Sequence, residues 1–560
     1  MKRAYILINI FYHNNTSCLL LLLIILGSTF HFYNLNWGAP YYFHPDERNI
    51  ASSVSQLRFP ENMNPHFFAY GSLPIYTIFL TGILLSFFST CQQFLSGCSV
   101  QFADAIIIGR FYSALFSTLL ILLIFFVGKL LHSTKVGLLA AIFTTFATGI
   151  IQYSHFATFE LWTTFFSVIL FFFCLKLLQK NKKIILFLLA ATTGILLSIK
   201  ATNALLLPLP LIAISISTLT SRTGTNIQAR LIRLFLSSLF IVVLAGLIYM
   251  LTNPFAFLAS RDFRGSMDYE SGVALGTIPV FYTGEFYNTY PVLFQISKVL
   301  PFLLNPLLTI LGILGFFLCC IITIRKKTPQ LLLFVLILSI LFFPQSFFFV
   351  KWTRYMVPTI PFFILSGSIF LSWIHTEKAT KRFSNSLLKV TIITTCIFGI
   401  SYFITAFVEP DTRIQAALTA KKYIPKTAPI LSETYDMGIV AFNEHFEKIS
   451  LFNFYDLDAP SSALAHTLLS EQLAHASYLI LPSQRLIATR NGNPQQFPNG
   501  HLFYRSLTDK PTQFQKIYET PCTIFCQITF IGNQSTRFEG TANSFDRPPV
   551  QIYQIQKNEQ

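Results

Sequence analysis

The segment Tyr42-Phe43-His44-Pro45-Asp46-Glu47-Arg48 places two adjacent carboxylates, a histidine and an arginine just after the first long apolar stretch of the chain. A charged side chain drawn to the centre of a bilayer costs about 2.5–3.5 kcal/mol, so acids at the mouth of a membrane helix usually serve a site. The chemistry open to this segment is general-base catalysis or metal binding. The alternatives are an acidic cap on a juxtamembrane helix and a solvated loop with no chemical role.

The composition sets the class of protein in which these acids must work. Of 560 residues, 53% are hydrophobic and only 11% are charged, with 61 phenylalanines and a mean hydropathy of +0.56. This balance excludes a single soluble core and predicts a polytopic membrane protein. The 40 Lys and Arg residues exceed the 24 Asp and Glu residues, but they gather in short clusters between apolar runs. They therefore indicate topology and do not indicate nucleic-acid binding.

The positions of the apolar runs and of the basic clusters together predict about eleven transmembrane helices. The expected spans cover residues 17–35, 106–131, 136–152, 161–178, 184–199, 204–219, 234–251, 301–324, 331–349, 355–374 and 388–407. Every basic cluster then lies in the cytoplasm, and the odd number places the chain end outside. The apolar run 73–88 would reverse all later loops if it crossed, so we expect a juxtamembrane or re-entrant helix on the outer surface.

The domain plan has two parts. Residues 1–408 form the membrane domain, with a catalytic outer loop at 36–105, and residues 409–560 form a soluble outer domain that we call the tail. The tail has a normal domain size of about 150 residues. A helix over 412–423 and strands over 429–432, 478–481 and 550–555 predict a small α/β fold without a nucleotide-binding glycine motif.

Two cysteine pairs fall on the predicted outer side, where disulfide bonds are chemically allowed. They are Cys91 with Cys98 and Cys522 with Cys526. Neither spacing has the four-ligand pattern of a zinc site.

The order of motifs in the first 410 or so residues resembles the phospholipid-carrier-dependent glycosyltransferases. This family includes the protein O-mannosyltransferases and the aminoarabinose transferases of lipid A, which share the C-type membrane glycosyltransferase fold. The motifs are His44-Pro45-Asp46-Glu47, Asn64-Pro65-His66-Phe67-Phe68, Tyr70-Gly71-Ser72-Leu73-Pro74, Arg110, Ser154-His155-Phe156-Ala157-Thr158-Phe159-Glu160, Ser198-Ile199-Lys200 and Lys351-Trp352-Thr353-Arg354-Tyr355. One departure is Glu160, which stands where many relatives carry Asp.

The resemblance implies transfer of a sugar from a polyprenyl-phosphate donor to a glycan, lipid or protein acceptor. It also implies a multi-pass protein of a prokaryotic cell membrane, in contact with membrane lipids, whose active site and tail are extracytoplasmic. Direct attack by the acceptor inverts the anomeric carbon through an oxocarbenium-like transition state. Asp46 is the expected base, Glu47 would hold Asp46 or the acceptor, and Glu160 is the third catalytic candidate.

The departing phosphate gains negative charge, so fixed cations near it stabilise the transition state. The cations at predicted outer ends of spans are Arg110, Lys351, Arg354 and Lys200. The alternative for each is snorkelling of a long side chain to lipid headgroups.

The residues expected to line a substrate cavity are His44, His66, His155, Glu285 and Tyr287, the last two from the aromatic and polar loop 253–290. The three histidines, together with Asp46, Glu61 and Glu160, also offer ligands to a divalent metal. Inverting transfer does not require a metal, so no cofactor is assigned and this alternative stays open.

A rival class is a lipid-linked sugar flippase or another transporter, which would also need many spans. Transporters carry charges within their spans and often an internal repeat, whereas here the candidate charges gather at one face. A second rival is an assembly protein with decayed catalytic residues, which the presence of Asp46 and Arg110 disfavours.

Overall fold

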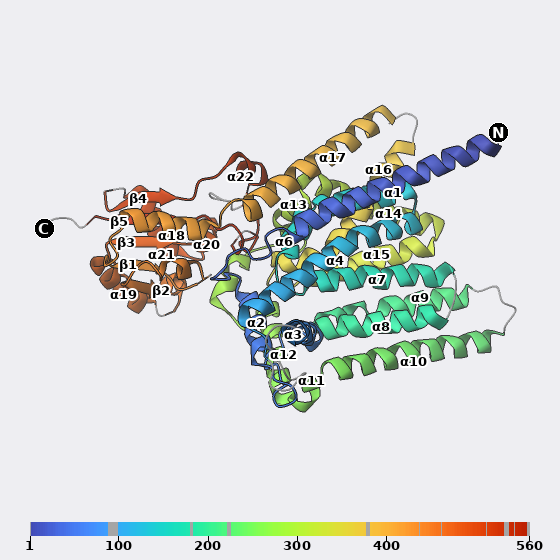
Figure 1. Cartoon of the computed structure of the whole chain (residues 1–560), viewed down its shortest axis with the longest axis horizontal. Helices are drawn as coiled ribbons and strands as arrows, with labels where there is room; N and C mark the ends of the chain where they lie inside the picture. Colours follow the sequence, from blue (N-terminus) through green and yellow to red (C-terminus); the bar gives the residue numbers. More distant parts are fainter. Residues whose placement is uncertain are drawn as a thin grey trace.

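The computed structural model describes residues 2–87, 99–179, 183–220, 226–376, 381–435, 437–460, 462–510, 512–530, 537–542 and 544–556. They form a bundle of long helices with a smaller α/β domain, the tail, beyond one end of the bundle (Figure 1). The first residues of the chain lie at the opposite end of the bundle from the tail. The Cys91 and Cys98 pair lies outside the described residues.

The bundle consists of apolar helices, with long connections from α1 to α4 and from α10 to α13. Its helices are α1 (Lys2–Phe32), α4 (Phe102–Leu131), α5 (Thr134–Phe146), α6 (Thr148–Ser154), α7 (Glu160–Gln179), α8 (Lys183–Ile199), α9 (Pro208–Leu219), α10 (Ile227–Thr252), α13 (Leu300–Leu304), α14 (Pro306–Lys326), α15 (Pro329–Ser346), α16 (Ile360–Thr376) and α17 (Lys381–Phe403). Shorter 3-10 or π turns extend them at η1 (Ala201–Leu206), η3 (Gln295–Val299), η4 (Thr353–Thr359) and η6 (Ile404–Val408).

Eight helices among the described residues are long and apolar enough to cross a membrane, or nine if the bent pair of α5 and α6 counts as one span. Two shorter apolar helices, Thr16–Phe32 and Lys183–Ile199, coincide with the remaining spans expected from the sequence. The multi-span membrane fold is thus confirmed, while the count of eleven stays a prediction.

One predicted span begins at the wrong residue. Residues 301–324 do not form a continuous helix, because Asn305 has a positive φ of 81° and separates α13 from α14. Its side-chain oxygen accepts a hydrogen bond from the Leu308 backbone N–H at 2.9 Å, and Pro306 occupies the first turn. Both features start a helix, so α14 begins at Pro306.

Short helices cover the end of the bundle that faces the tail. They are α2 (Pro45–Gln56), α3 (Ser72–Phe87), α11 (Phe255–Leu258), α12 (Ser260–Leu275) and η2 (Phe281–Phe286). Pro45 opens α2, where its fixed φ favours a helix start and its missing N–H is no loss. Asp46 and Glu47 are therefore in the first turn of a helix. Of the apolar run 73–88, residues 73–87 are helical as expected, and the relation of this helix to the membrane stays a prediction.

The tail is a three-layer α/β domain. Its five strands, β1 (Ile430–Glu433), β2 (Ile449–Phe452), β3 (Tyr478–Leu481), β4 (Phe514–Glu519) and β5 (Gln551–Ile555), lie in the order β2-β1-β3-β5-β4. β1 pairs in parallel with β2 and β3, whereas β5 is antiparallel to both neighbours. The predicted helix and the three predicted strands are confirmed.

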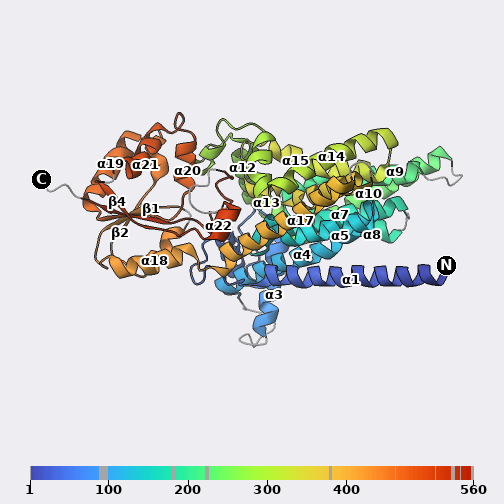
Figure 2. The same cartoon turned by 90° about the horizontal axis from the view of Figure 1, so that it is seen from above.

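Alternating side chains of the strands serve two cores. Leu431, Leu479 and Tyr553 pack with α19 (Ser462–His475), α20 (Arg485–Gly492) and α21 (Pro498–Asp509) on one face. Ile430, Ile480 and Ile552 pack with α18 (Thr412–Tyr423) on the other face (Figure 2). The second core also contains Phe43, which lies in the segment between α1 and α2 of the membrane domain and is completely buried.

A disulfide joins Cys522 to Cys526 at the start of the short helix α22 (Ile524–Thr529). The bond that the sequence left open for this pair is thus formed.

Candidate active site

A cavity of about 580 Å³ opens where six segments of the membrane domain meet. Its volume is in the range of small-molecule sites. Its ionisable and polar lining residues are Asp46, Asn49, Tyr70, Glu160, Thr163, Lys200, Thr202, Asn203, Asp268, Glu270, Ser271, Gln345, Arg354 and Tyr355. The cavity thus combines carboxylates, two cations and two phenols from segments that are far apart in the sequence.

Asp46 and Arg354 form an ion pair on the wall of this cavity, between Oδ2 and Nη1. About a quarter of each side chain is exposed, and Arg354 also lies over the ring of Trp352 at 4.5 Å. Burial alone would raise the pKa of Asp46, but Arg354, with smaller contributions from His44 and Lys200, outweighs it and holds that pKa below its ordinary value. Asp46 is therefore ionised at neutral pH, as a base must be.

Glu47 and Arg110 form a second ion pair behind the first, and both side chains are fully buried. Arg110 donates Nε–H and Nη2–H to the two carboxylate oxygens of Glu47 at 2.8 and 2.6 Å. Its Nη1 donates to the carbonyls of Leu35 and Trp37, and Glu47 also accepts the Ala157 N–H at 2.6 Å. Neither side chain lines the cavity, so the structure does not place Arg110 where a lipid phosphate in the cavity would contact it.

Glu160 begins α7 and lies in the same cavity with only 4% of its surface exposed. One carboxylate oxygen is 3.4 Å from the Tyr70 hydroxyl, and the other has no hydrogen-bond partner among the described residues. A buried carboxylate oxygen without a donor is costly unless a ligand or water satisfies it. Glu160 is thus arranged to accept a hydrogen bond from whatever fills the cavity.

Lys200 lies at the junction of α8 and η1, with its ammonium over the rings of Tyr70 and Tyr355 at 5.3 and 5.2 Å. Gly71 allows the chain before α3 to lie directly against the end of α8, because a Cβ on residue 71 would be 2.0 Å from the Ser198 carbonyl oxygen. Burial lowers the pKa of Lys200, and the nearest carboxylates act against that shift. Lys351 differs: its ammonium donates to the Phe349 carbonyl at 2.9 Å, and it does not line the cavity.

The polar loop 253–290 contributes Asp268 and Glu270 to the cavity, both from α12. Burial raises the pKa of Glu270, against the pull of Arg354 and Lys200. The polar loop 253–290 was recognised as a lining candidate, but Glu285 and Tyr287 were chosen from it. The spacing of residues in the sequence did not indicate that the cavity would be lined by α12 and not by the residues that follow it.

The histidines expected in the cavity lie elsewhere. The His44 ring is 4.4 Å from the ring of Phe545 in the tail. The His155 ring is stacked on Phe407 at 3.5 Å, with both ring nitrogens near backbone carbonyls. His66 is exposed on the loop before α3. None of them lines the 580 Å³ cavity, and their role in substrate binding stays a prediction.

Glu285 and Tyr287 also lie away from that cavity. Glu285 accepts the Gly540 N–H at 2.6 Å and so joins the membrane domain to the tail. Tyr287 is 37% exposed, with its ring 5.2 Å from that of Phe349. A role of these two residues in substrate binding likewise stays a prediction.

The suggested metal ligands are not brought together. Within the part of the chain that the structure describes, no group of three or more His, Cys, Asp or Glu side chains could hold a metal ion. Of the suggested set, Asp46 and Glu160 reach the cavity, whereas His44, His66, His155 and Glu61 are not among its lining residues. These residues therefore do not fit a metal site.

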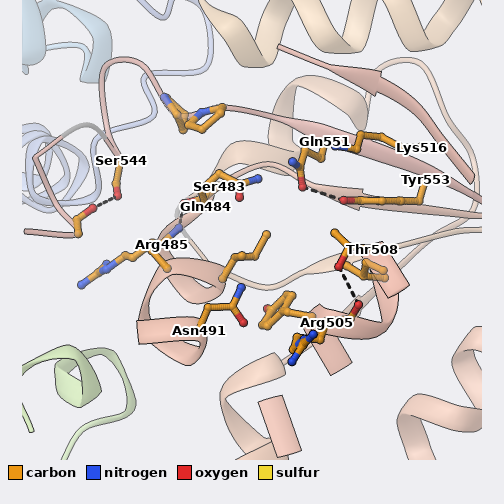
Figure 3. A pocket seen from close by; sticks show the side chains of 17 residues that line it. Ser483, Gln484, Arg485, Asn491, Arg505, Thr508, Lys516, Ser544, Gln551 and Tyr553 are labelled. Atoms are coloured by element: carbon orange, nitrogen blue, oxygen red, sulfur yellow. Dashed lines mark hydrogen bonds between the residues drawn. The ribbon is translucent and has the colours of Figure 1, made fainter. Parts of the chain in front are cut away.

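A second cavity, of about 380 Å³, lies in the tail between α20, α21 and the last strands (Figure 3). Its charged lining consists of Arg485, Arg505 and Lys516, with no carboxylate among the described lining residues. Arg505 and Lys516 have acidic neighbours, Asp509 and Glu519, that stand outside the lining. The lining suits an anionic or neutral ligand and disfavours a cation.

No protein-family model matches the sequence, and a search of curated proteins finds no match. The structure is similar to the oligosaccharyltransferase AglB from Archaeoglobus fulgidus in complex with an inhibitory peptide and a dolichol-phosphate. The two share 11% identity, with a TM-score of 0.50, 97% of this chain and 89% of AglB covered. AglB tethered to an acceptor peptide gives a TM-score of 0.50 at 11% identity over 96% of this chain and 88% of that one.

ArnT from Cupriavidus metallidurans, bound to undecaprenyl phosphate, gives a TM-score of 0.42 at 11% identity, with 84% of this chain and 93% of ArnT covered. At these identities the similarity concerns the fold. The chain has the fold of AglB, a C-type membrane glycosyltransferase fold, as the sequence motifs implied.

Proposed function

We propose that this protein transfers a sugar from a polyprenyl-phosphate donor to an acceptor at the outer face of a membrane, with inversion at the anomeric carbon. The observation that carries the proposal is the cavity wall itself. An ionised carboxylate, Asp46, stands there with two cations, Arg354 and Lys200. A base beside fixed positive charge is what attack on a sugar phosphate needs.

Asp46 would take the proton of the attacking hydroxyl or amine as the acceptor atom bonds to the anomeric carbon. The bond from that carbon to the phosphate oxygen breaks on the opposite side, and the phosphate leaves with the electron pair. Lys200 and Arg354 would stabilise the charge that grows on the phosphate. Because Asp46 bears no covalent sugar in this scheme, one displacement inverts the centre.

The remaining polar groups have roles in orientation. The unpartnered oxygen of Glu160 can accept a hydrogen bond from a sugar or acceptor hydroxyl. Glu270 can do the same from the opposite segment, and Tyr70 and Tyr355 offer aromatic faces to a sugar ring. The Glu47–Arg110 pair would act indirectly, by fixing the helix that presents Asp46.

The similarity to AglB supports the choice of donor, because that protein was solved with a dolichol-phosphate and with an acceptor peptide. Both carry over as proposals: a polyprenyl-phosphate sugar as donor, and a glycan, lipid or protein as acceptor. An extracytoplasmic active site and a prokaryotic origin belong to the same proposal.

The test is reconstitution of the purified protein in liposomes with a set of polyprenyl-phosphate-linked sugars and candidate acceptors. We expect release of free polyprenyl phosphate and a product whose anomeric configuration is opposite to that of the donor. Retention of configuration would contradict direct attack. Movement of the lipid-linked sugar across the bilayer without any transfer would instead establish the flippase alternative.

A further inference from the structure

The two segments that carry Asp46 and Arg354 are both held by the tail. Three residues before Asp46, Phe43 enters the tail core, and the guanidinium of Arg413 lies over its ring at 3.8 Å. The next residue, His44, packs on Phe545 with ring centroids 4.4 Å apart. The tail therefore fixes the chain immediately before the first turn of α2.

The other partner of the ion pair is held by Glu539. This carboxylate is 1% exposed and accepts hydrogen bonds from the backbone N–H and the hydroxyl of Thr353, at 2.9 and 2.7 Å. Thr353 directly precedes Arg354 and begins η4, whose free N–H groups a carboxylate satisfies. Glu539 is kept in place by Thr541, whose backbone N–H donates to it at 2.9 Å.

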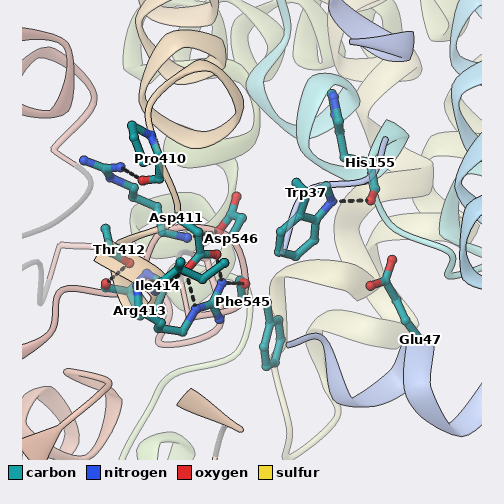
Figure 4. A network of polar contacts seen from close by, with 12 residues as sticks. Trp37, Glu47, His155, Pro410, Asp411, Thr412, Arg413, Ile414, Phe545 and Asp546 are labelled. Atoms are coloured by element: carbon teal, nitrogen blue, oxygen red, sulfur yellow. Dashed lines mark hydrogen bonds and ion pairs between the residues drawn. The ribbon is translucent and has the colours of Figure 1, made fainter. Parts of the chain in front are cut away.

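Further contacts seat the same part of the tail on the bundle. Gln152 donates to the Ala542 carbonyl at 2.7 Å and to Asp546 at 3.2 Å, and the Tyr402 hydroxyl also donates to Asp546. Figure 4 shows Arg413, Phe545 and Asp546 of the tail lying opposite Trp37, Glu47 and His155 of the membrane domain. Asp546 and Gln152 are buried, so these contacts belong to a tight interface.

We propose that the tail completes the active site, because Arg413, Phe545 and Glu539 position the base Asp46 and its partner Arg354. We call these three residues the tail clamp. None of them lines the cavity, so the clamp acts through Phe43, His44 and Thr353. The inference rests on the proposed function. It adds a positioning role for three residues that follow Asp46 by about 370 to 500 positions in the sequence.

The decisive experiment uses the full chain with Glu539→Ala. Loss of the Thr353 contacts should let Arg354 drift from Asp46. We expect kcat to fall about 10- to 100-fold, since small displacements in an active site cost that much, with the KM for donor changed by less than about threefold. Glu539→Gln keeps one oxygen that can accept the Thr353 N–H and should recover most of the rate.

A second readout separates positioning from a general loss of structure. Asp46 is faced by Arg354, His44 and Lys200, with Glu160 and Glu270 also in the cavity. If Glu539 holds Arg354 against Asp46, the acid limb of the kcat profile should move to higher pH by about half a unit or more in Glu539→Ala. Arg354→Gln should move it in the same way, and the double variant no further.

The matched control is Glu447→Gln, which removes a tail carboxylate from an exposed pair with Lys426. It should leave rate and pH profile at parent values. If Glu539→Ala does not yield folded protein, Phe545→Leu, which removes the ring that packs on His44, gives the same comparison of kcat and of the acid limb. Parent values of kcat and of the acid limb in the folded variant would overturn the inference while leaving the proposed function intact. Absence of transfer by the parent would instead remove the proposed function.

Discussion

Two neighbouring acids in the first turn of α2 form ion pairs of opposite character. Asp46 meets Arg354 at the cavity wall, where both remain about a quarter exposed. Glu47 meets Arg110 in the interior, where both are fully buried and every carboxylate oxygen has a donor. Adjacent residues of a helix point about 100° apart, so one turn can serve a cavity and a core at once. Each pair joins a carboxylate to an arginine, and the two pairs differ in whether a ligand in the cavity can reach them.

The largest effect expected from this contrast is on catalysis at Asp46. Asp46→Asn keeps the size of the side chain but cannot accept a proton, so the rate of transfer should fall about 10²- to 10⁴-fold. Stability should change little, because a partly exposed ion pair contributes about 0–1 kcal/mol. The transfer rate of the purified variant checks the expected loss of activity, and its thermal unfolding checks the expected stability. A parent-like rate would shift the base to Glu160.

The buried pair should show the opposite result, with a large loss of stability. Glu47→Gln leaves the Arg110 charge uncompensated in the interior, which costs about 3–5 kcal/mol. The unfolding temperature in detergent should fall strongly, and Arg110→Gln should have a similar effect. The double variant should lose less than the sum, because the two residues share one interaction. If Glu47→Gln kept its unfolding temperature and lost only activity, the contrast between the pairs would collapse.

Two lysines extend the comparison to the cations. Lys200→Gln removes a charge from the cavity and should lower kcat/KM for the donor about 10- to 100-fold, since a charged hydrogen bond contributes about 1.5–3 kcal/mol. Lys351→Gln should change it less than about twofold, because that ammonium donates to a backbone carbonyl away from the cavity. Competition by free polyprenyl phosphate should weaken only in the Lys200 variant. Equal effects of both variants would argue that these lysines serve lipid headgroups.

The smallest expected effect concerns the acid that joins the domains. Burial, and then the neighbouring Glu539, raise the pKa of Glu285 from 4.5 to about 8. The folded state thus holds a proton that the unfolded state releases, so this contribution to stability is complete below pH 4.5 and is lost as the pH rises through about 8. The unfolding temperature should fall over this range and fall less in Glu285→Gln. If the unfolding temperature fell equally with pH in the parent and in Glu285→Gln, the assignment of this pH dependence to Glu285 would be contradicted.

The sequence predicted the elements better than the contacts between them. Hydrophobic runs located the bundle helices, because burial in lipid imposes length and composition. Three helices, α1, α10 and α17, begin 7 to 15 residues before the predicted spans. The start of α14 depended on the backbone conformation of Asn305, which composition does not reveal. In the tail, the mostly buried strands β1, β3 and β5 were predicted, whereas β2 and β4, with their exposed residues, were not.

The candidate site could be predicted in part. Local motifs identified Asp46, Glu160, Lys200 and Arg354, which all line the cavity. The roles of Glu47 and Arg110 depended on the direction in which each side chain points, and sequence order does not give it. Glu539 carried no signal at all, since 186 positions separate it from Thr353. Only the fold brings these residues together.

The burial of Phe43 in the tail core has a consequence for how such a protein can be recombined. Phe43 belongs to the segment that leads into the first turn of α2, yet its side chain packs among Ala416, Ile430 and Val550. A tail grafted from another protein would leave this ring without a pocket unless it brought a matching segment. An exchange of the tail should therefore include the segment around Phe43, although more than 360 residues separate Phe43 from the tail.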